Sequence, residues 1–139
     1  MLRTYARALV DLEISTIKKS RLITDEHRPV VMFMMSTNNR RLFGLYSVKA
    51  AMDDQPIMAS ELAKEIGISR NACDQIISDA EGLGYIDVDR SRTNYRYIKA
   101  TPLVVEVFTE YARWNAESAR SLNMPQINLA LEVTTFSAK

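Results

Sequence analysis

Two short amphipathic stretches separated by a glycine form the clearest pattern of hydrophobic and polar positions in the chain. In the first stretch, Leu62, Ala63 and Ile66 share one helical face. In the second stretch, residues 70–83, hydrophobic side chains recur at spacings of three, four and seven, and we expect these to face inward: Ala72, Cys73, Ile76, Ile77, Ala80 and Leu83. A short helix, a tight turn and a longer helix with a polar outer face predict a helix-turn-helix.

Residues at the ends of these two stretches support that prediction. Ser60 is placed to cap the first helix, and Gly67 can adopt the left-handed conformation that ends it. Ser69 is the expected cap of the second helix. Gly82 and Gly84 lie where the second helix should stop. Each predicted helix therefore has its own start and stop signals.

A polar-tipped hairpin is predicted directly after the second helix, over residues 85–99. Residues 85–89 and 95–99 have strand composition, and Ile57 is expected to add a short third strand. Pro102 follows at a position suited to the first turn of another helix. A hairpin in this place turns a helix-turn-helix into a winged helix.

Long helices are expected on both sides of the winged helix. Residues 2–22 contain no Gly or Pro and carry a broad hydrophobic stripe: Leu2, Tyr5, Leu9, Val10, Leu12, Ile14 and Ile17. Residues 103–122 carry a second stripe that contains several aromatic residues, and we expect it to pack against the first. Because the two stripes exceed what a small domain can bury, they indicate a dimer interface; the alternative is packing within one chain.

The remaining segments are less specific. Residues 30–35 form a hydrophobic run that fits a buried helix or a strand, and the pattern does not decide between them. Residues 40–53 predict a helix with six inward side chains: Leu42, Phe43, Leu45, Tyr46, Val48 and Ala51. The tail, residues 123–139, alternates as a strand does, although a helix starting at Pro125 fits as well. Without repeats or linkers, residues 1–139 are expected to form one domain with its core at 38–102.

Composition excludes several classes of protein. The 139 residues have a net charge of +1, and the segment from 69 to 99 is neutral, which is not typical of a non-specific nucleic-acid binder. No hydrophobic run approaches the roughly 20 residues that span a bilayer. The single cysteine fits a reducing cytoplasm. We therefore expect a cytoplasmic protein without membrane contact.

Residues suited to catalysis or metal binding are scarce. His27 is the only histidine, expected as a solvated loop residue, and no Gly-rich phosphate loop is present. We expect no enzyme activity, cofactor or metal. Cys73 could suggest a redox sensor, but its inward position favours a buried thiol with a raised pKa.

The motifs resemble the multiple-antibiotic-resistance regulator (MarR) family of bacteria. The resemblance covers roughly residues 38–122, and these segments carry it: Glu61-Leu62-Ala63, Ile68-Ser69-Arg70, Gly84-Tyr85-Ile86, Asp89-Arg90-Ser91-Arg92 and Thr101-Pro102. It implies a mainly α fold with a small β-hairpin wing (α+β) and a homodimer formed by the long terminal helices. It also implies a helix at residues 30–35 and a small, often aromatic and acidic, effector that nothing in the sequence names.

The polar face of the second helix supplies candidate contacts to double-stranded DNA. Asn71 and Gln75 have side chains that pair bidentately with adenine, whereas Arg70 suits guanine or a phosphate. Asp74 departs from the family pattern on this face, and it can accept a hydrogen bond from the amino group of cytosine. Two serines, Ser69 and Ser78, are expected to contact phosphates.

The hairpin tip is the second candidate DNA contact. Its arginines are expected to reach the neighbouring minor groove or its phosphates, while Glu81 and Asp87 are expected to lie away from the tip. The predicted contacts are Arg90, Ser91, Arg92, Thr93, Asn94 and Arg96. The alternative function is a winged-helix protein-interaction or dimerisation module without DNA binding, which the neutral charge of residues 69–99 keeps open.

Overall fold

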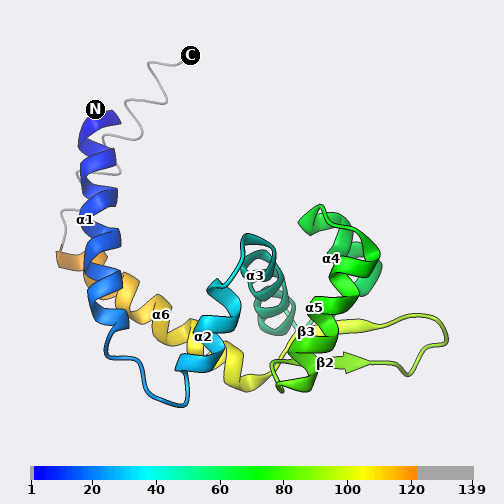
Figure 1. The fold of residues 1–139 in the computed structure, drawn as a ribbon. Helices are drawn as coiled ribbons and strands as arrows, with labels where there is room; N and C mark the ends of the chain where they lie inside the picture. Colours follow the sequence, from blue (N-terminus) through cyan, green and yellow to red (C-terminus); the bar gives the residue numbers. More distant parts are fainter. Residues whose placement is uncertain (1, 122–139) are drawn as a thin grey trace. The chain divides into compact units, whose positions relative to one another are not determined.

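The computed structural model describes residues 2–121, which fold into helices and one small sheet (Figure 1). Contacts divide the described residues into two compact units, one formed by Thr24–Phe108 and the other by residues 2–23 and 109–121. The elements in chain order are α1 (Leu2–Ser20), α2 (Arg28–Met35), α3 (Asn38–Met52), β1 (Ile57–Met58), α4 (Ala59–Ile66), α5 (Arg70–Gly82), β2 (Ile86–Asp89), β3 (Tyr97–Ala100) and α6 (Pro102–Ser121). Helix α6 contributes residues to both units.

Helices α2 and α3 lead into the winged helix. The run at residues 30–35 is helical, as the family resemblance implied, and Pro29 lies in the first turn of α2. Thr37 caps α3 by accepting a hydrogen bond from the backbone N–H of Arg40 at 3.0 Å. Both helices therefore start with local signals that the sequence contains.

The inward face of α3 differs from the prediction. Phe43 and Val48 are buried and Tyr46 and Ala51 are half-buried, but Leu42 and Leu45 are exposed, at 39% and 43%. Smaller residues are buried in their place: Gly44, Ser47 and Ala50. The hydroxyl of Ser47 donates to the carbonyl of Phe43 at 2.8 Å, so it can be buried without losing a hydrogen bond.

The helix-turn-helix consists of α4 and α5. Gly67 has the expected left-handed backbone, with φ of 84°, and Ser69 caps α5 by accepting from the backbone N–H of Ala72 at 3.1 Å. The prediction that Ser60 caps α4 is wrong, because the helix begins at Ala59 and its N-cap is Met58, two residues before Ser60.

The inward face of α5 is narrower than predicted. Four of the six predicted residues are buried: Cys73, Ile76, Ile77 and Ala80. Ala72 is exposed at the edge of the hydrophobic stripe, and Leu83 is 56% exposed because it is the C-cap and lies beyond the last helical turn.

The wing is a three-stranded antiparallel sheet in the order β1-β3-β2. Ile98 lies at its centre, opposite Ile57 on one side and Val88 on the other, as the predicted third strand requires. The two hairpin strands are shorter than predicted, so residues 90–96 form an extended tip (Figure 1).

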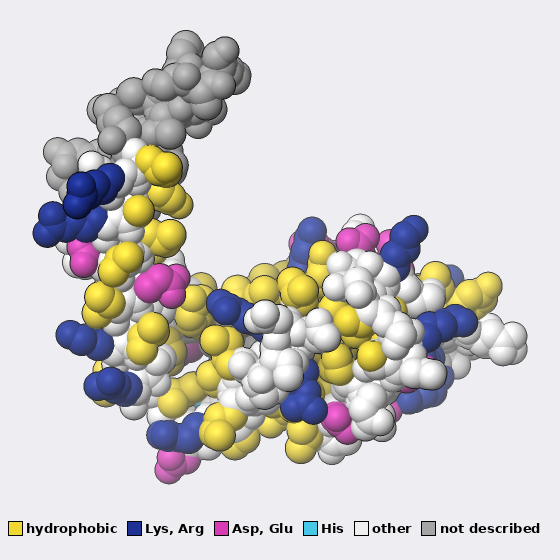
Figure 2. All heavy atoms as spheres, turned by 45° about the horizontal axis from the view of Figure 1, so that its top comes forward, with side chains coloured by type: hydrophobic (Ala, Val, Ile, Leu, Met, Phe, Trp, Pro, Cys, Tyr) yellow, Lys and Arg dark blue, Asp and Glu magenta, His cyan; other side chains and the backbone are white. Residues whose placement is uncertain are grey.

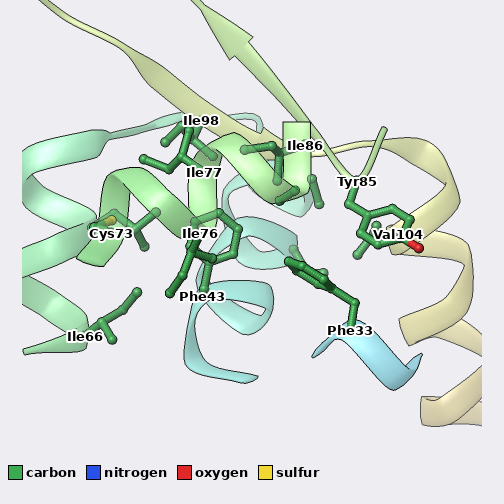
Figure 3. Packing of buried hydrophobic residues seen from close by; sticks show 14 of the residues in the cluster. Phe33, Phe43, Ile66, Cys73, Ile76, Ile77, Tyr85, Ile86, Ile98 and Val104 are labelled. Atoms are coloured by element: carbon green, nitrogen blue, oxygen red, sulfur yellow. The ribbon is translucent and has the colours of Figure 1, made fainter. Parts of the chain in front are cut away.

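Hydrophobic side chains from helices and sheet share one core in this unit (Figure 3). Phe43, Leu62, Ile77 and Ile98 are almost completely buried. The ring of Phe33 meets that of Tyr85 edge-on, with centroids 5.3 Å apart. This core packs α5 against the sheet, so the outer face of α5 and the wing are held in fixed positions relative to each other.

In the other unit, α1 and α6 contact each other. The hydroxyls of Ser15 and Ser118 are hydrogen-bonded at 2.9 Å, and Lys19 lies 3.5 Å from Glu117. Much of the hydrophobic stripe of α1 stays exposed in the single chain: Leu2, Leu9, Val10, Ile14 and Ile17. Figure 2 shows hydrophobic side chains on the surface along this helix. The predicted tail, residues 123–139, lies outside the described residues. Among the described helices, none is long and apolar enough to cross a membrane.

Candidate nucleic-acid interface

The first turns of α5 present polar side chains to solvent. Arg70, Asn71, Gln75 and Ser78 are exposed, as the sequence predicted. Within residues 2–121, the side chains of Arg70 and Asn71 make no hydrogen bond or ion pair, so their donors are available to a ligand. Ser69 is also exposed, and its hydroxyl oxygen accepts the capping hydrogen bond described above.

Asp74 and Arg96 form an ion pair between α5 and the wing. The Nη2 of Arg96 lies 2.5 Å from the Oδ1 of Asp74. Together with Arg70 and Asn94, these two residues help to line a small cavity of about 70 Å³ between the helix-turn-helix and the hairpin. Two residues predicted as separate DNA contacts are therefore partners of each other.

Glu81 and Arg90 form a second link between α5 and the wing. Both terminal nitrogens of Arg90 donate to the Glu81 carboxylate, at 2.6 and 2.7 Å. These hydrogen bonds hold the pKa of Glu81 below its ordinary value and raise that of Arg90. The prediction that Glu81 lies away from the arginines of the hairpin tip is wrong, because β2 packs on α5 and the long Arg90 side chain reaches back from the end of that strand.

The tip of the wing is held by local contacts. The backbone N–H of Ser91 donates to the Asp89 carboxylate at 2.8 Å, which lowers the pKa of Asp89. Arg92 lies over the ring of Tyr97 at 5.4 Å from its centre. Among the described residues, no carboxylate lies within ion-pair distance of Arg92. Its neighbours Thr93 and Asn94 are exposed.

Asp79 is a further polar residue on the outer side of α5 that was not among the predicted contacts. Its Oδ1 accepts a hydrogen bond from the Nε2 of Gln75 at 3.0 Å, and its Oδ2 lies 3.3 Å from the Nη2 of Arg40 on α3. The spacing of four residues between Gln75 and Asp79 was the available signal, since such pairs meet on one helical face.

Cys73 and His27 are titratable residues that are buried and do not form part of this exposed surface. Cys73 is buried, and burial, followed by the nearby Asp74, raises the pKa of its thiol, as predicted. His27 is buried rather than solvated, and its Nε2 lies 3.7 Å from the carboxylate of Glu106 because α2 starts against α6. Across residues 2–121, no three His, Cys, Asp or Glu residues are grouped as metal ligands.

No family model matches the chain, and no curated protein matches it by sequence. Solved structures of transcription regulators do match it. The DNA complex of MepR from Staphylococcus aureus has a TM-score of 0.56 and 14% identity over 99% of this chain and 98% of MepR. NadR in complex with 4-hydroxyphenylacetate has a TM-score of 0.51 and 15% identity over 91% of both chains. The regulator Tm0710 from Thermotoga maritima has a TM-score of 0.52 and 14% identity over 87% of both chains.

The match to MepR covers almost the whole chain, and at such low identity these likenesses establish architecture rather than activity. The chain has the winged helix-turn-helix fold of the MarR-family transcriptional regulators.

Proposed function

We propose that this protein is a dimeric, sequence-specific DNA-binding transcription regulator that acts in the bacterial cytoplasm. In this proposal α5 enters the major groove, and the hairpin of residues 85–99 contacts the adjacent minor groove or backbone. The observation that carries the proposal is the exposed N-terminal turn of α5, where Arg70 and Asn71 have unsatisfied donors. A helix of this kind contacts base edges with that same turn.

The roles of the side chains follow from their chemistry. Asn71 offers the donor and acceptor that match adenine, and Arg70 matches guanine or a phosphate. Arg92 is the wing arginine best able to contact DNA, since Arg90 and Arg96 are already paired with acids of α5. The smaller polar residues are assigned to phosphate contacts: Ser69, Ser78, Ser91, Thr93 and Asn94.

The dimer is supported by the exposed stripe of α1. Leu2, Val10 and Ile17 are each more than half exposed in the single chain, at 64%, 55% and 57%. Hydrophobic side chains lined up in this way favour a protein partner over water. A second copy would place two recognition helices on two half-sites of the DNA.

A small-molecule effector is part of the proposal. NadR binds 4-hydroxyphenylacetate in its solved complex. Aromatic acids are therefore the first ligands to test against this protein, by their effect on DNA affinity.

The second candidate function is a winged-helix protein-interaction module. It is favoured by the pairing of two wing arginines with Asp74 and Glu81, which leaves little free positive charge on this surface. A gel shift with bacterial genomic fragments at two salt concentrations separates the two functions. The regulator should retard a subset of fragments and lose affinity as salt rises.

The matched variants are Arg70→Ala and Lys49→Ala, which remove the same charge from two exposed positions. Only Arg70→Ala should abolish the selective shift. If the wild-type protein retards no fragment even at low salt, the interaction module becomes the better description.

A further inference from the structure

The amide of Gln75 has a fixed direction on the outer face of α5. Its Nε2 donates to the Oδ1 of Asp79, one helical turn further along, at 3.0 Å. An ionised carboxylate only accepts hydrogen bonds, so the amino end of the amide must face Asp79 and the carbonyl end must face away. The residue type alone predicts that Gln75 pairs with adenine, but it does not predict which end of the amide is free.

Asp79 is itself held by a second helix. Its Oδ2 lies 3.3 Å from the Nη2 of Arg40. Arg40 is in turn fixed by a hydrogen bond to the hydroxyl of Ser36 at 3.1 Å, and its guanidinium lies over the ring of Phe33 at 4.6 Å. Because Phe33 belongs to the buried core, the orientation of Asp79 is set by the folded framework rather than by solvent.

We propose that Asp79 determines base specificity by acting through Gln75. The inference rests on the proposed function, in which α5 lies in the major groove. With its amino group held by Asp79, Gln75 offers its carbonyl oxygen as the acceptor for a base edge. Adenine and cytosine present an exocyclic amino group in the major groove, whereas guanine and thymine present the acceptors O6 and O4 there. Because every base pair carries one such amino group, the selection applies to the contacted strand: there Gln75 accepts from adenine or cytosine and not from guanine or thymine.

Asp79 does not touch DNA in this arrangement, so it is a positioning residue. Without its carboxylate, the amide of Gln75 can turn either end toward the groove, because a glutamine carries both a donor and an acceptor. Asp79→Asn is the closest replacement in shape. The asparagine amide carries both a donor and an acceptor, so it can hydrogen-bond to either end of the Gln75 amide. Base preference should then relax at the one position that Gln75 reads and nowhere else.

The test begins with the full-length wild-type protein and a pool of random-sequence duplexes. The selected site is then resynthesised with each of the four base pairs at every position, and binding is measured for four proteins: wild type, Gln75→Ala, Asp79→Asn and Asp87→Asn. Asp87 is an exposed acid of β2 without a side-chain hydrogen bond or ion pair in the described part of the chain, so its variant matches the charge change of Asp79→Asn.

At one base pair per half-site, the wild type should show a preference and should lose roughly tenfold in affinity when the exocyclic amino group of that pair is removed, with purine in place of adenine or 2-pyrimidinone in place of cytosine. Gln75→Ala and Asp79→Asn should both flatten the preference at that position. Asp87→Asn should raise affinity on all duplexes alike and keep the preference.

Three outcomes overturn the inference. The first is a Gln75-dependent base pair at which removing the exocyclic amino group leaves wild-type affinity unchanged, which wild type and Gln75→Ala reveal even if Asp79→Asn is unstable. The second is a folded Asp79→Asn protein, judged by its melting temperature, that keeps the wild-type preference. Both of these leave the proposed function intact. The third is a wild-type protein that enriches no sequence at all, which overturns the proposed function as well.

Discussion

The guanidinium of Arg90 donates two hydrogen bonds, of 2.6 and 2.7 Å, to the carboxylate of Glu81. Glu81 lies near the end of α5 and Arg90 directly follows β2, so this contact joins the proposed recognition helix to the wing. The carboxylate offsets the positive charge that Arg90 would otherwise offer to a phosphate.

Glu81→Gln should therefore strengthen the salt dependence of DNA binding. Freeing Arg90 adds up to one phosphate contact, which steepens the slope of log affinity against log salt by up to about 1. Binding to one duplex at three salt concentrations measures this slope. Asp87→Asn removes the same charge from β2 and should change the slope less; equal changes in the two variants would contradict the role of the Glu81–Arg90 contact.

Acid should remove the stability that this contact provides. Arg90 holds the pKa of Glu81 below its ordinary value, so Glu81 binds fewer protons in the folded protein than in the unfolded one. The contribution is complete above the ordinary glutamate pKa of about 4.3 and is lost as the pH falls through the lower folded value. Melting temperatures of wild type and Glu81→Gln should converge between neutral pH and strong acid. A difference that stays constant over this range would rule the linkage out.

Phe43→Ala and Leu42→Ala should differ sharply although the residues are neighbours on α3. Phe43 is completely buried, and truncating a buried phenylalanine costs about 3–5 kcal/mol of unfolding free energy. Leu42 is 39% exposed, so its truncation should cost much less. Denaturant unfolding of both variants measures the difference. Similar losses of unfolding free energy would contradict the finding that Phe43, and not Leu42, faces the core.

Leu9→Ala should weaken the proposed dimer more than it destabilises the single chain. Leu9 is 41% exposed on α1, so much of its side chain has no contact within one chain. Met52 is 55% exposed on α3, and Met52→Ala serves as the control for losing an exposed hydrophobic side chain. Light scattering over a dilution series should show earlier dissociation for Leu9→Ala only. A wild-type protein that is monomeric at every concentration would remove the dimer from the proposal.

Local signals in the sequence predicted the elements of the helix-turn-helix, whereas the helix at residues 30–35 was implied only by the family resemblance. Gly67 needs a left-handed backbone and Ser69 has a capping hydroxyl, and both act within their own turn of chain. The predicted start of α4 was two residues too late because Met58 and Ser60 both lie where a helix can begin. Such boundaries depend on tertiary contacts that the local pattern does not contain.

The links between α5 and the wing could not be predicted in the same way. Asp74 and Arg96 are 22 residues apart, and Glu81 and Arg90 are nine residues apart, so each pair meets only once the hairpin has folded back on the helix. Hydrophobic periodicity assigns residues to a face but does not pair charges across elements. The sequence therefore predicted which polar residues are exposed on α5 and the wing. It did not predict that Arg90 and Arg96 are paired with acids, so this surface has less unpaired positive charge than expected.

Arg92→Ala and Asn71→Ala should weaken DNA binding in different ways. Arg92 lies on the exposed tip of the wing without an acidic partner among the described residues, so it can meet a phosphate of any sequence. Its loss should lower affinity equally on cognate and scrambled duplexes and reduce the salt slope by about 1.

Asn71 is uncharged and fixed on the first turn of α5, so its binding energy must come from particular base edges. Its alanine variant should lose roughly 1–3 kcal/mol on the cognate duplex alone and leave the salt slope almost unchanged. Titrations of both duplexes at three salt concentrations measure the two quantities together. If the two variants lose the same affinity on both duplexes, the division between a reading helix and an anchoring wing is wrong.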